Sequence, residues 1–424
     1  MVSHRQKLPM SKKDRLVLLG LLIPSALFAS FDGQLRALLL RQIQSSFHTP
    51  IASLGVINIP IQAGQFLGFF IVRLSDRYGR RSLLLWTIAG YAVSTALTAT
   101  SWNIWSYGAF QALSQVFIGG EFGVAVTLLA ESVPDVSRGK YLSLLLMVAP
   151  LGAVFAGSLL ALGLLDTTLT WRLFYLISLP PLALTVLFRP KLKESPLFLK
   201  ERDLISSTHA PNTTFREGVF EVLKTRSLRK ATLVIGAVSL LQELALTGTI
   251  GWWAYYVETQ RHIPVATTGI LFALAALVAV PGYLLCGFLM DRFGRRPTLL
   301  LYLCLGIVGG LGTFLSSTLT VLGLSLFIAA FFGLGVSPVL SAFTAELFPT
   351  HLRASASGWV RNLFANSGAV VGPALVGVLA SRSSFGLSVS EAAVVVIAIS
   401  VASIPLAAFS LDETRGVSLE SLNP

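Results

Sequence analysis

Charged residues are scarce in this chain of 424 residues, and acidic residues are scarcer than basic ones. Asp and Glu together number 20, Lys and Arg number 32, and only 12% of all residues are charged. Soluble domains carry about 25% charged residues, so this composition excludes an ordinary soluble domain. Hydrophobic residues make up 54% of the chain, and the mean hydropathy is +0.74. The composition therefore predicts a protein that lies in a lipid bilayer.

Cysteine is also rare, and its placement does not suggest chemistry. The two cysteines, Cys286 and Cys304, both lie in apolar runs, which argues against a disulfide framework. The sequence carries no nucleophile–base pair, metal-ligand cluster or phosphate-binding loop, so we expect neither an enzyme nor a cofactor. The formal net charge of +12 comes from basic residues between the apolar segments. We interpret that charge as a topology signal and expect no nucleic-acid partner.

Long apolar runs are abundant, and each approaches the roughly 20 residues that cross a bilayer as a helix. They predict an all-α integral membrane protein with twelve transmembrane helices in two groups of six. The candidate spans are residues 16–42, 52–72, 82–100, 105–130, 140–165, 171–188, 231–257, 266–290, 297–316, 320–345, 355–380 and 391–410. The predicted regions are an N-terminal tail (1–15), a six-helix bundle (16–188), a central loop (189–230), a second six-helix bundle (231–410) and a C-terminal tail (411–424).

Lys and Arg alternate between the two sides of the predicted membrane. Basic residues precede the first span and follow the second and fourth, and the largest group lies in residues 189–230. By the positive-inside rule, both termini and the central loop are cytoplasmic. We therefore expect a multi-pass protein of the cell membrane, either a plasma or an inner membrane. Residues 1–15 lack a following small-residue cleavage pattern, so we interpret them as a retained cytoplasmic tail.

Two motifs recur at one and the same offset in the numbering. The first is LSDRYGRR, whose Asp76 corresponds to Asp291 of LMDRFGRR, and 291 − 76 = 215. The second is AESVPDVSR, whose Glu131 corresponds to Glu346 of AELFPTHLR, and 346 − 131 = 215. Two separate motifs with one offset indicate a duplicated six-helix unit. Because the copies keep the same orientation, they are parallel repeats related by an axis along the membrane normal.

These motifs resemble signatures of the major facilitator superfamily. In that family the first motif begins with a glycine, which is Gly287 in the second copy and is replaced by Val72 in the first. AESVPDVSRG, KESPLFL and DETRG are similar to motifs of sugar porters, metabolite–proton symporters and organic-ion transporters, and Gly119-Gly120-Glu121 is closest to the metabolite–proton symporters. The resemblance covers essentially the whole chain. It implies a secondary transporter that works by alternating access between its two bundles.

The repeated motifs place charges at the cytoplasmic ends of spans. We expect the repeated aspartate to face the N-terminus of a neighbouring helix, where the helix dipole favours negative charge by about 0.3–1 kcal/mol. We expect the arginine after the motif glycine to reach the glutamate of the second motif, which would form a two-state latch. The alternative is that these arginines are topology anchors only. The latch candidates are Asp76, Arg77, Arg80, Glu131, Arg138, Asp291, Arg292, Arg295, Glu346 and Arg353.

Small residues also recur at the same offset. Ala153 and Gly157 correspond to Gly368 and Gly372, and each pair is a small-xxx-small pattern that permits close helix approach. We interpret them as packing surfaces and not as a binding site.

Charges inside the predicted spans are the functional candidates, because ionisable side chains in a membrane face cavities and mark substrate or proton pathways. The proton-coupling candidates are Asp32, Glu121 and Glu243. The scaffold charges recur in the second copy, whereas the positions that correspond there to Asp32 and Glu121 are Thr247 and Val336. Such an asymmetry is expected of a coupling site built onto a duplicated scaffold.

Asp32 and Arg36 are one helical turn apart. At 100° per residue they share one side of the first span with Ser25 and Phe28, while Arg41 lies on the opposite side. Protonation of Asp32 would free Arg36 to bind the carboxylate of a substrate. The alternative is a structural ion pair near the outer surface.

The substrate-binding candidates are Arg36, Gln242, Trp252, Tyr256, Arg361, Asn362 and Asn366. Alternatives stay open for several candidates. The run from Trp252 to Tyr256 would equally suit an interfacial aromatic belt. Asn362 and Asn366 would equally suit a bridge between helices, as would a protonated Glu121.

The leading hypothesis is a proton-coupled symporter of a small organic anion or polar metabolite. We expect a monomer whose driving force is the proton gradient and whose partners are a small-molecule substrate and the bilayer. The alternative is a proton-coupled exporter of amphipathic or cationic compounds, because Ala149-Pro150-Leu151-Gly152 faintly resembles a motif of drug antiporters. A membrane sensor is disfavoured because the central loop has no recognisable signalling domain.

Overall fold

The computed structural model describes residues 11–133, 141, 144–145, 147–163, 170–188, 191–194, 222–348, 352–381 and 384–414. Helices make up nearly all of these described residues, and no strand is found among them. Ten of the helical segments are long and apolar enough to cross a membrane, and Val148–Ala161 is a shorter apolar helix. The all-α membrane fold predicted from the sequence is confirmed.

Most helices follow the predicted spans, but the predicted span 171–188 is interrupted at residues 177–179 and forms two helices. In the first half of the chain they are α1 (Lys12–Leu38), α2 (Leu40–Phe47), α3 (Ile51–Val56), α4 (Asn58–Tyr78), α5 (Arg80–Ala99), α6 (Ile104–Ser132), α8 (Val148–Ala161), α9 (Thr170–Leu176) and α10 (Pro180–Phe188). In the second half they are α13 (Arg226–Thr259), α14 (Val265–Phe293), α15 (Arg295–Leu315), α16 (Leu319–Ile328), η2 (Ala329–Leu334), α17 (Ser337–Glu346), α18 (Arg353–Ser357), η3 (Gly358–Ala365), α19 (Asn366–Leu379), α20 (Val389–Ser400) and α21 (Ser403–Ser410).

The chain forms two compact units. Unit 1 comprises Met1–Arg36, Pro60–Ala156 and Leu165–Asn212, and unit 2 comprises Ala37–Ile59, Gly157–Leu164 and Thr213–Pro424. Two short pieces of the first half of the sequence, residues 37–59 and 157–164, therefore group with the second half.

The first predicted span, residues 16–42, is wrong at its C-terminal end. Leu39 has φ −102° and ψ 12°, outside the α-helical region, so the helix stops at Leu38 and a separate helix, α2, begins at Leu40. Helix α2 ends at Phe47, and the next residue, His48, adopts a left-handed conformation with φ 48°. The break means that Arg41 does not continue the helix that carries Asp32.

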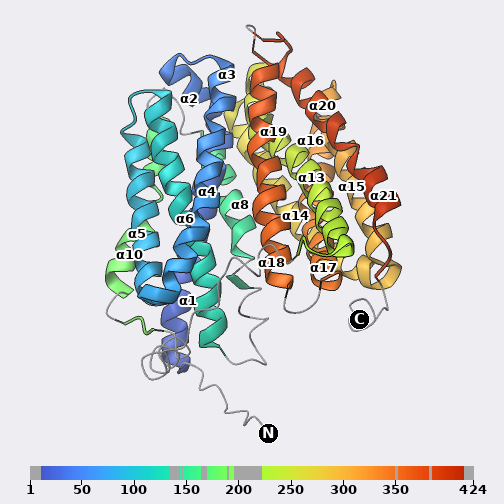
Figure 1. Cartoon of the computed structure of the whole chain (residues 1–424). Coiled ribbons are helices and arrows are strands. Elements are labelled where there is room, and N and C mark those ends of the chain that lie inside the picture. The colour runs from blue at the N-terminus through green and yellow to red at the C-terminus, as the bar shows by residue number, and fades with distance from the viewer. Residues whose placement is uncertain are drawn as a thin grey trace. The chain divides into compact units, whose positions relative to one another are not determined.

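Unit 1 has an apolar core between α1, α5 and α6. Its fully buried side chains include Leu18, Leu21, Leu84, Ile88 and Leu128. Helices α4 and α6 approach closely: an ideal Cβ on Gly64 would lie 2.3 Å from the Ala112 carbonyl oxygen, and one on Gly68 would lie 2.7 Å from the Gly120 nitrogen. Figure 1 shows α4, α5 and α6 lying side by side.

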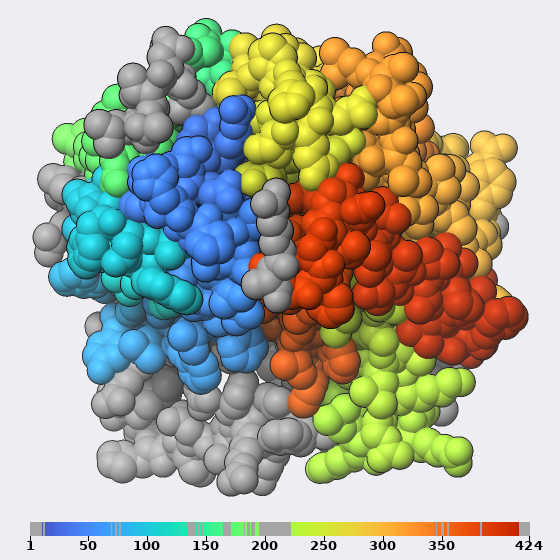
Figure 2. Space-filling model, turned by 90° about the horizontal axis from the view of Figure 1, so that it is seen from above, coloured from blue at the N-terminus to red at the C-terminus, as the bar shows by residue number. Residues whose placement is uncertain are grey.

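Unit 2 is organised around α13, which packs against α19, α20 and η3 (Figure 1). Figure 2 shows α19 and α20, in orange-red and red, adjacent on one face of this unit. An ideal Cβ on Gly368 would lie 2.2 Å from the Leu240 carbonyl oxygen, and one on Gly372 would lie 2.3 Å from that of Leu244. The interpretation of these two glycines as a packing surface is confirmed.

Two helical segments of unit 2 have π geometry, which the sequence did not indicate. They are η2 in the tenth predicted span and η3 in the eleventh. A π-helix bonds residue i to residue i+5, so it inserts an extra residue into a helix, and it is frequent at functional sites.

Candidate functional site

A ladder of polar side chains joins α1 to α6 in the apolar interior of unit 1. Ser25 donates a hydrogen bond of 2.6 Å to Glu121 Oε1, and Ser114 donates one of 3.4 Å to Asp32 Oδ2. The partners are seven residues apart on each helix and their numbers run in opposite directions, so the two helices are antiparallel here. Residues seven apart lie on the same face of a helix, which is why these four side chains line up.

Asp32 is completely buried. Its neighbours are Ser114, whose hydroxyl also bonds Thr95 at 2.9 Å, and Gln111, which donates to Thr98 at 3.1 Å. Arg36 attracts the carboxylate electrostatically from the next turn of α1. The predicted proximity of Asp32 and Arg36 is confirmed, and the role of Asp32 as a proton carrier stays a prediction.

Arg36 is partly buried and faces an oxygen-rich environment. Its Nη2 donates to Gln62 Oε1 at 3.2 Å. Two buried phenols, Tyr107 and Tyr175, lie within electrostatic range of the guanidinium and share a hydrogen bond of 2.8 Å. Tyr107 is seven residues before Ser114 on α6, so it continues the same polar ladder.

Four polar atoms of this ladder are buried and have no hydrogen-bond partner among the described residues. They are Asp32 Oδ1, Arg36 Nη1, Gln111 Oε1 and Glu121 Oε2. Each unsatisfied buried polar group costs about 1–3 kcal/mol, and more when it is charged. A proton or a polar ligand would satisfy these atoms, and their role in transport stays a prediction.

Sequence reasoning missed most of this environment. It singled out Asp32, Arg36 and Glu121 because they are charged, it noted Gln111 only as a replacement for an arginine of related transporters, and it passed over Ser114, Tyr107 and Tyr175. The available signal was the polar stripe on α6, where Tyr107, Gln111, Ser114 and Glu121 recur at helical spacing through an apolar run.

The charged candidates of unit 2 meet between α13 and η3. Glu243 on α13 and Arg361 on η3 attract each other electrostatically, and Tyr283 of α14 lies near both. Asn362 lies in η3 and Asn366 begins α19, so the extra residue of the π turn separates the two amides. The site that the sequence suggested in this unit is therefore assembled on an irregular helix.

Three other candidates of unit 2 serve contacts within the protein. Gln242 donates to the Gly333 carbonyl of η2 at 2.9 Å. Trp252 Nε1 donates to the Pro373 carbonyl at 2.8 Å, and the Tyr256 hydroxyl donates to the Phe314 carbonyl at 3.3 Å. Both aromatic residues are at most 2% exposed. These three side chains bridge helices in unit 2, and their role as substrate contacts stays a prediction.

The predicted contacts between the repeated charges are present in both units. Arg80 Nε lies 2.7 Å from Glu131 Oε2 in unit 1, and Arg295 Nη2 lies 2.9 Å from Glu346 Oε1 in unit 2. Arg295 also donates through Nε to both oxygens of Glu346, at 3.0 and 3.2 Å. We call the end of each unit that carries these pairs its basic end. The role of the pairs as a latch stays a prediction.

The sequence analysis predicts that the repeated aspartate lies at the N-terminus of a neighbouring helix, but in unit 2 a glutamate lies there instead. Asp291 is 72% exposed and pairs with Arg295 at 3.4 Å, whereas Glu413 accepts hydrogen bonds from the backbone N–H groups that begin α15. In unit 1, Glu194 accepts from the Arg81 N–H at 3.0 and 3.2 Å at the start of α5. The physical reason is that the aspartate belongs to the preceding helix and extends into solvent. Glu194 and Glu413 belong to KESPLFL and DETRG, so those motifs supply the caps.

The remaining latch candidates are placed as follows. Arg292 lies 5.9 and 5.8 Å from the ring centroids of Phe288 and Phe293, and Arg353 donates to the Phe348 carbonyl at 3.1 Å. The side chains of Asp76 and Arg77 lie outside the described part of the structure, as do Arg138, the tail residues 1–10 and most of the central loop.

The sequence of this chain matches a known protein family along most of its length. The family model described as Major Facilitator Superfamily matches residues 22–373 and, in a second match, residues 235–421. The chain belongs to the major facilitator superfamily. It is therefore a multi-pass membrane protein of the transporter class, whose relatives move small molecules.

Relatives of known or assigned function cover almost the whole chain. A putative metabolite transport protein of Haemophilus influenzae is 28% identical over 92% of this chain and 94% of its own. A probable 4-methylmuconolactone transporter of Cupriavidus pinatubonensis is 27% identical over 93% and 89%, and the niacin transporter of Acinetobacter baylyi is 25% identical over 88% and 87%.

A solved structure shows the same fold. The xylose transporter XylE from E. coli, in an inward open conformation, matches with a TM-score of 0.73 and 17% identity and covers 96% of this chain and 99% of its own. This similarity concerns the fold alone.

Proposed function

We propose that this protein is a proton-coupled symporter of small organic acids. The observation that carries the proposal is the Asp32–Arg36 pair, in which the buried atoms Asp32 Oδ1 and Arg36 Nη1 both lack a hydrogen-bond partner among the described residues. A structural ion pair is stable when its remaining lone pairs and protons are satisfied, and this one leaves atoms of both partners open.

The chemistry follows from charge balance in a low-dielectric site. With Asp32 ionised, its charge offsets that of Arg36, and an anionic substrate would add an uncompensated charge. Protonation of Asp32 leaves Arg36 as an uncompensated cation, and a substrate carboxylate then takes the place of the aspartate as its counter-ion. Arg36 is suited to this role because the guanidinium presents planar, paired donors that match a carboxylate. Proton and acid would thus cross together as an electrically neutral load.

The other membrane acids have supporting roles in the proposal. Glu121, held by Ser25, lies seven residues along α6 from Ser114, which places a second carboxyl on the same ladder as Asp32. Glu243 faces Arg361 in unit 2, and Asn362 and Asn366 lie on the same helical stretch. We propose that Glu121 passes the proton onward and that Arg361 and its neighbouring amides contact the substrate.

The relatives support an organic acid as the load. Niacin is a ring carboxylate, and 4-methylmuconolactone also carries a carboxyl group. Each name describes the relative and not this chain, so the class of compound is a proposal here. We further propose a monomer in a bacterial inner membrane with both termini in the cytoplasm, with the proton gradient as driving force and with no cofactor, nucleic-acid partner or catalytic activity.

Transport into proteoliposomes tests the proposal. Purified protein is reconstituted and offered labelled nicotinate, followed by other labelled carboxylates, with and without an inwardly directed proton gradient. We expect accumulation above equilibrium only when the gradient is present. Uptake that is indifferent to the gradient would contradict symport. Extrusion of amphipathic dyes without uptake of any carboxylate would favour the alternative, a proton-coupled exporter.

A further inference from the structure

Two buried phenols near Arg36 form a hydrogen-bonded pair that the proposed function does not use. Tyr107 of α6 is 1% exposed, Tyr175 of α9 is completely buried, and their hydroxyl oxygens lie 2.8 Å apart. Each phenol has one O–H proton to donate, but the pair shares a single hydrogen bond. One of the two protons therefore has no acceptor among the described residues. We call it the spare phenol proton.

The pair is held in place by its surroundings in unit 1. Arg172 of α9 donates to the carbonyls of Ala99 and Ser101 at 2.8 and 2.6 Å, which fixes α9 to the end of α5. The Trp171 ring centroid lies 6.0 Å from that of each tyrosine, edge to face, and aromatic contacts of this geometry are favourable. The spare phenol proton therefore belongs to a well-anchored part of the unit and not to a loose side chain.

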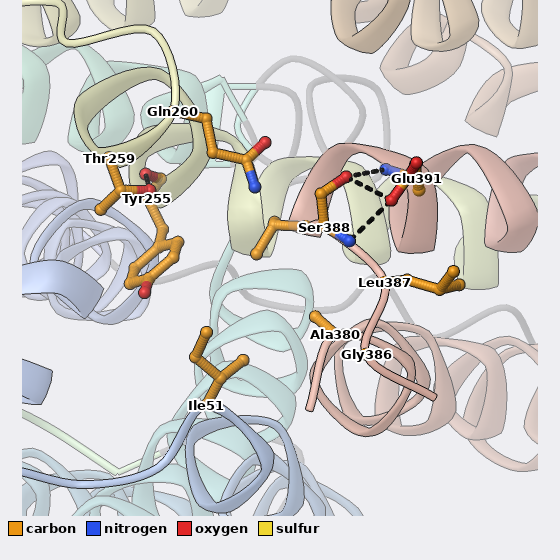
Figure 3. A pocket seen from close by; sticks show the side chains of 10 residues that line it. Ile51, Tyr255, Thr259, Gln260, Ala380, Gly386, Leu387, Ser388 and Glu391 are labelled. Carbon is orange, nitrogen blue, oxygen red and sulfur yellow. Dashed lines mark hydrogen bonds between the residues drawn. The ribbon is translucent and has the colours of Figure 1, made fainter. Parts of the chain in front are cut away.

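Hydroxyl groups elsewhere in the protein have acceptors, as a cavity of unit 2 shows. This cavity of about 390 Å³ is lined in part by Tyr255, Thr259 and Ser388 (Figure 3). The Tyr255 hydroxyl donates to Gln44 Oε1 at 2.8 Å, and the Thr259 hydroxyl donates to the Tyr255 carbonyl at 2.7 Å. The Ser388 hydroxyl donates to Glu391 Oε2 at 2.8 Å. Since each of these O–H groups is already satisfied, the cavity offers no comparable reason to bind a solute.

One turn further along α6, a buried acceptor also lacks a partner. Gln111 is completely buried, and its Oε1 has no hydrogen-bond partner in the described part of the chain. The orientation of this amide follows from Thr98, whose hydroxyl donates to the Ser94 carbonyl at 3.1 Å. Because that proton is committed, the Thr98 oxygen can only accept. It therefore faces the amide nitrogen of Gln111, at 3.1 Å, and leaves Oε1 without a donor.

An unsatisfied donor and an unsatisfied acceptor thus lie close to the arginine of the proposed site. Tyr107 and Gln111 are four residues apart and share one face of α6. Tyr107 lies within electrostatic range of Arg36, and Gln111 is a neighbour of Asp32. A hydroxyl group can accept one hydrogen bond and donate another at the same oxygen, whereas a carboxylate only accepts and an ammonium only donates. The polar atoms here therefore match a molecule that carries both a carboxylate and a hydroxyl group.

We propose that the acid bound at Arg36 is a hydroxy acid, whose hydroxyl group accepts the spare phenol proton and donates to Gln111 Oε1. This inference rests on the proposed function, because it presupposes that Arg36 binds a carboxylate, and it narrows the substrate to hydroxylated acids. The specificity-determining residues are Tyr107, Tyr175 and Gln111. An acid without the hydroxyl group leaves both buried groups unsatisfied, and sites that bind a substrate hydroxyl reject such analogues strongly.

Calorimetric titration of the purified full-length protein with matched acids tests the inference. The two series are benzoate with its three monohydroxy isomers and butyrate with its three monohydroxy derivatives. The isomers place the hydroxyl group at different distances from the carboxylate. We expect at least one hydroxy acid to bind at least tenfold more tightly than the parent acid of its series. A preference below tenfold in every pair would overturn the inference.

The double variant Tyr107→Phe/Tyr175→Phe tests whether the phenols cause this preference. Replacing both partners of a buried hydrogen bond by apolar groups of the same shape is nearly neutral for stability, so the variant should fold. We expect it to bind the parent acid within threefold of the unmodified protein and to lose the tenfold preference. The matched control is Tyr302→Phe, because Tyr302 is an equally buried phenol of unit 2 that donates to the Gly282 carbonyl at 2.8 Å. This control should keep the preference.

The outcomes separate the inference from the proposed function. If acids bind but the hydroxyl group makes no difference, the inference is overturned and binding of organic acids stands. A preference that survives in Tyr107→Phe/Tyr175→Phe would overturn the assignment to the phenols. If neither series binds while labelled nicotinate accumulates under a proton gradient, the inference alone is overturned. If nicotinate does not accumulate either, the proposed function fails and the inference fails with it.

Discussion

At the scale of single residues, the candidates of the two units differ in how their buried polar atoms are satisfied. Trp252 and Tyr256 are buried, but each donates to a backbone carbonyl, so nothing about them calls for a ligand. Asp32 and Arg36 each keep a buried polar atom without a partner among the described residues. Since such atoms are costly, the proposed function assigns the proton and the substrate carboxylate to them.

Arg36→Lys should weaken substrate binding by at least tenfold. Lysine keeps the charge but presents a single ammonium, which does not hold Gln62 and a substrate carboxylate in the paired geometry of a guanidinium. A tenfold loss corresponds to about 1.4 kcal/mol. Calorimetric titration with the transported acid measures it. Arg261→Lys is the control, because Arg261 bonds the Ser317 carbonyl away from the ladder. Equal affinity in Arg36→Lys would show that Arg36 does not hold the substrate.

At the scale of helices, glycine contacts fix how closely the spans pack. Gly372 of α19 meets the carbonyl of Leu244 on α13, whereas no atom of the described residues lies within 4 Å of a Cβ added to Gly287 of α14. Both glycines are helical, so intrinsic propensity alone would favour alanine at either position by up to about 1 kcal/mol. Packing therefore determines which of the two glycines tolerates an added methyl group.

Gly372→Ala should destabilise the protein and Gly287→Ala should not. A methyl group 2.3 Å from the Leu244 oxygen forces α13 and α19 apart, and overpacking of this kind costs about 1–3 kcal/mol. Thermal unfolding in one detergent measures the effect as a lower Tm for Gly372→Ala, with Gly287→Ala equal to or slightly above the parent. A Tm for Gly372→Ala at or above that of the parent would mean that the helices are not held at this contact.

The sequence allowed the spans, the repeat and the pairs Arg80–Glu131 and Arg295–Glu346 to be predicted, because apolar length and a fixed offset are properties of the chain itself. The break at Leu39 could not be predicted, since no glycine or proline marks it and the contacts of α2 with α13 come from distant sequence. The burial of Glu258, whose side chain is 0% exposed at the end of α13, could not be predicted for a related reason. An acid at the end of a span is ordinarily solvated, and only the fold shows that it is buried.

At the scale of the whole molecule, the charges divide into two classes. Those at the basic end recur at the offset of the internal repeat and make the same contact in each unit. Those of the ladder have no counterpart in the other copy. This division is expected of a duplicated scaffold in which the symmetric part supports movement and the asymmetric part carries the chemistry. The central claim is that Asp32 carries the coupled proton.

Proteoliposomes that contain Asp32→Asn test this claim most directly, with a carboxylate that the parent protein accumulates as the labelled solute. Asparagine mimics the protonated aspartate and does not release a proton, so binding and exchange should survive while coupling is lost. We predict that the variant exchanges external for internal solute at a rate within a few-fold of the parent, yet shows no accumulation under an inward proton gradient. Gradient-driven accumulation by Asp32→Asn equal to that of the parent would contradict the account.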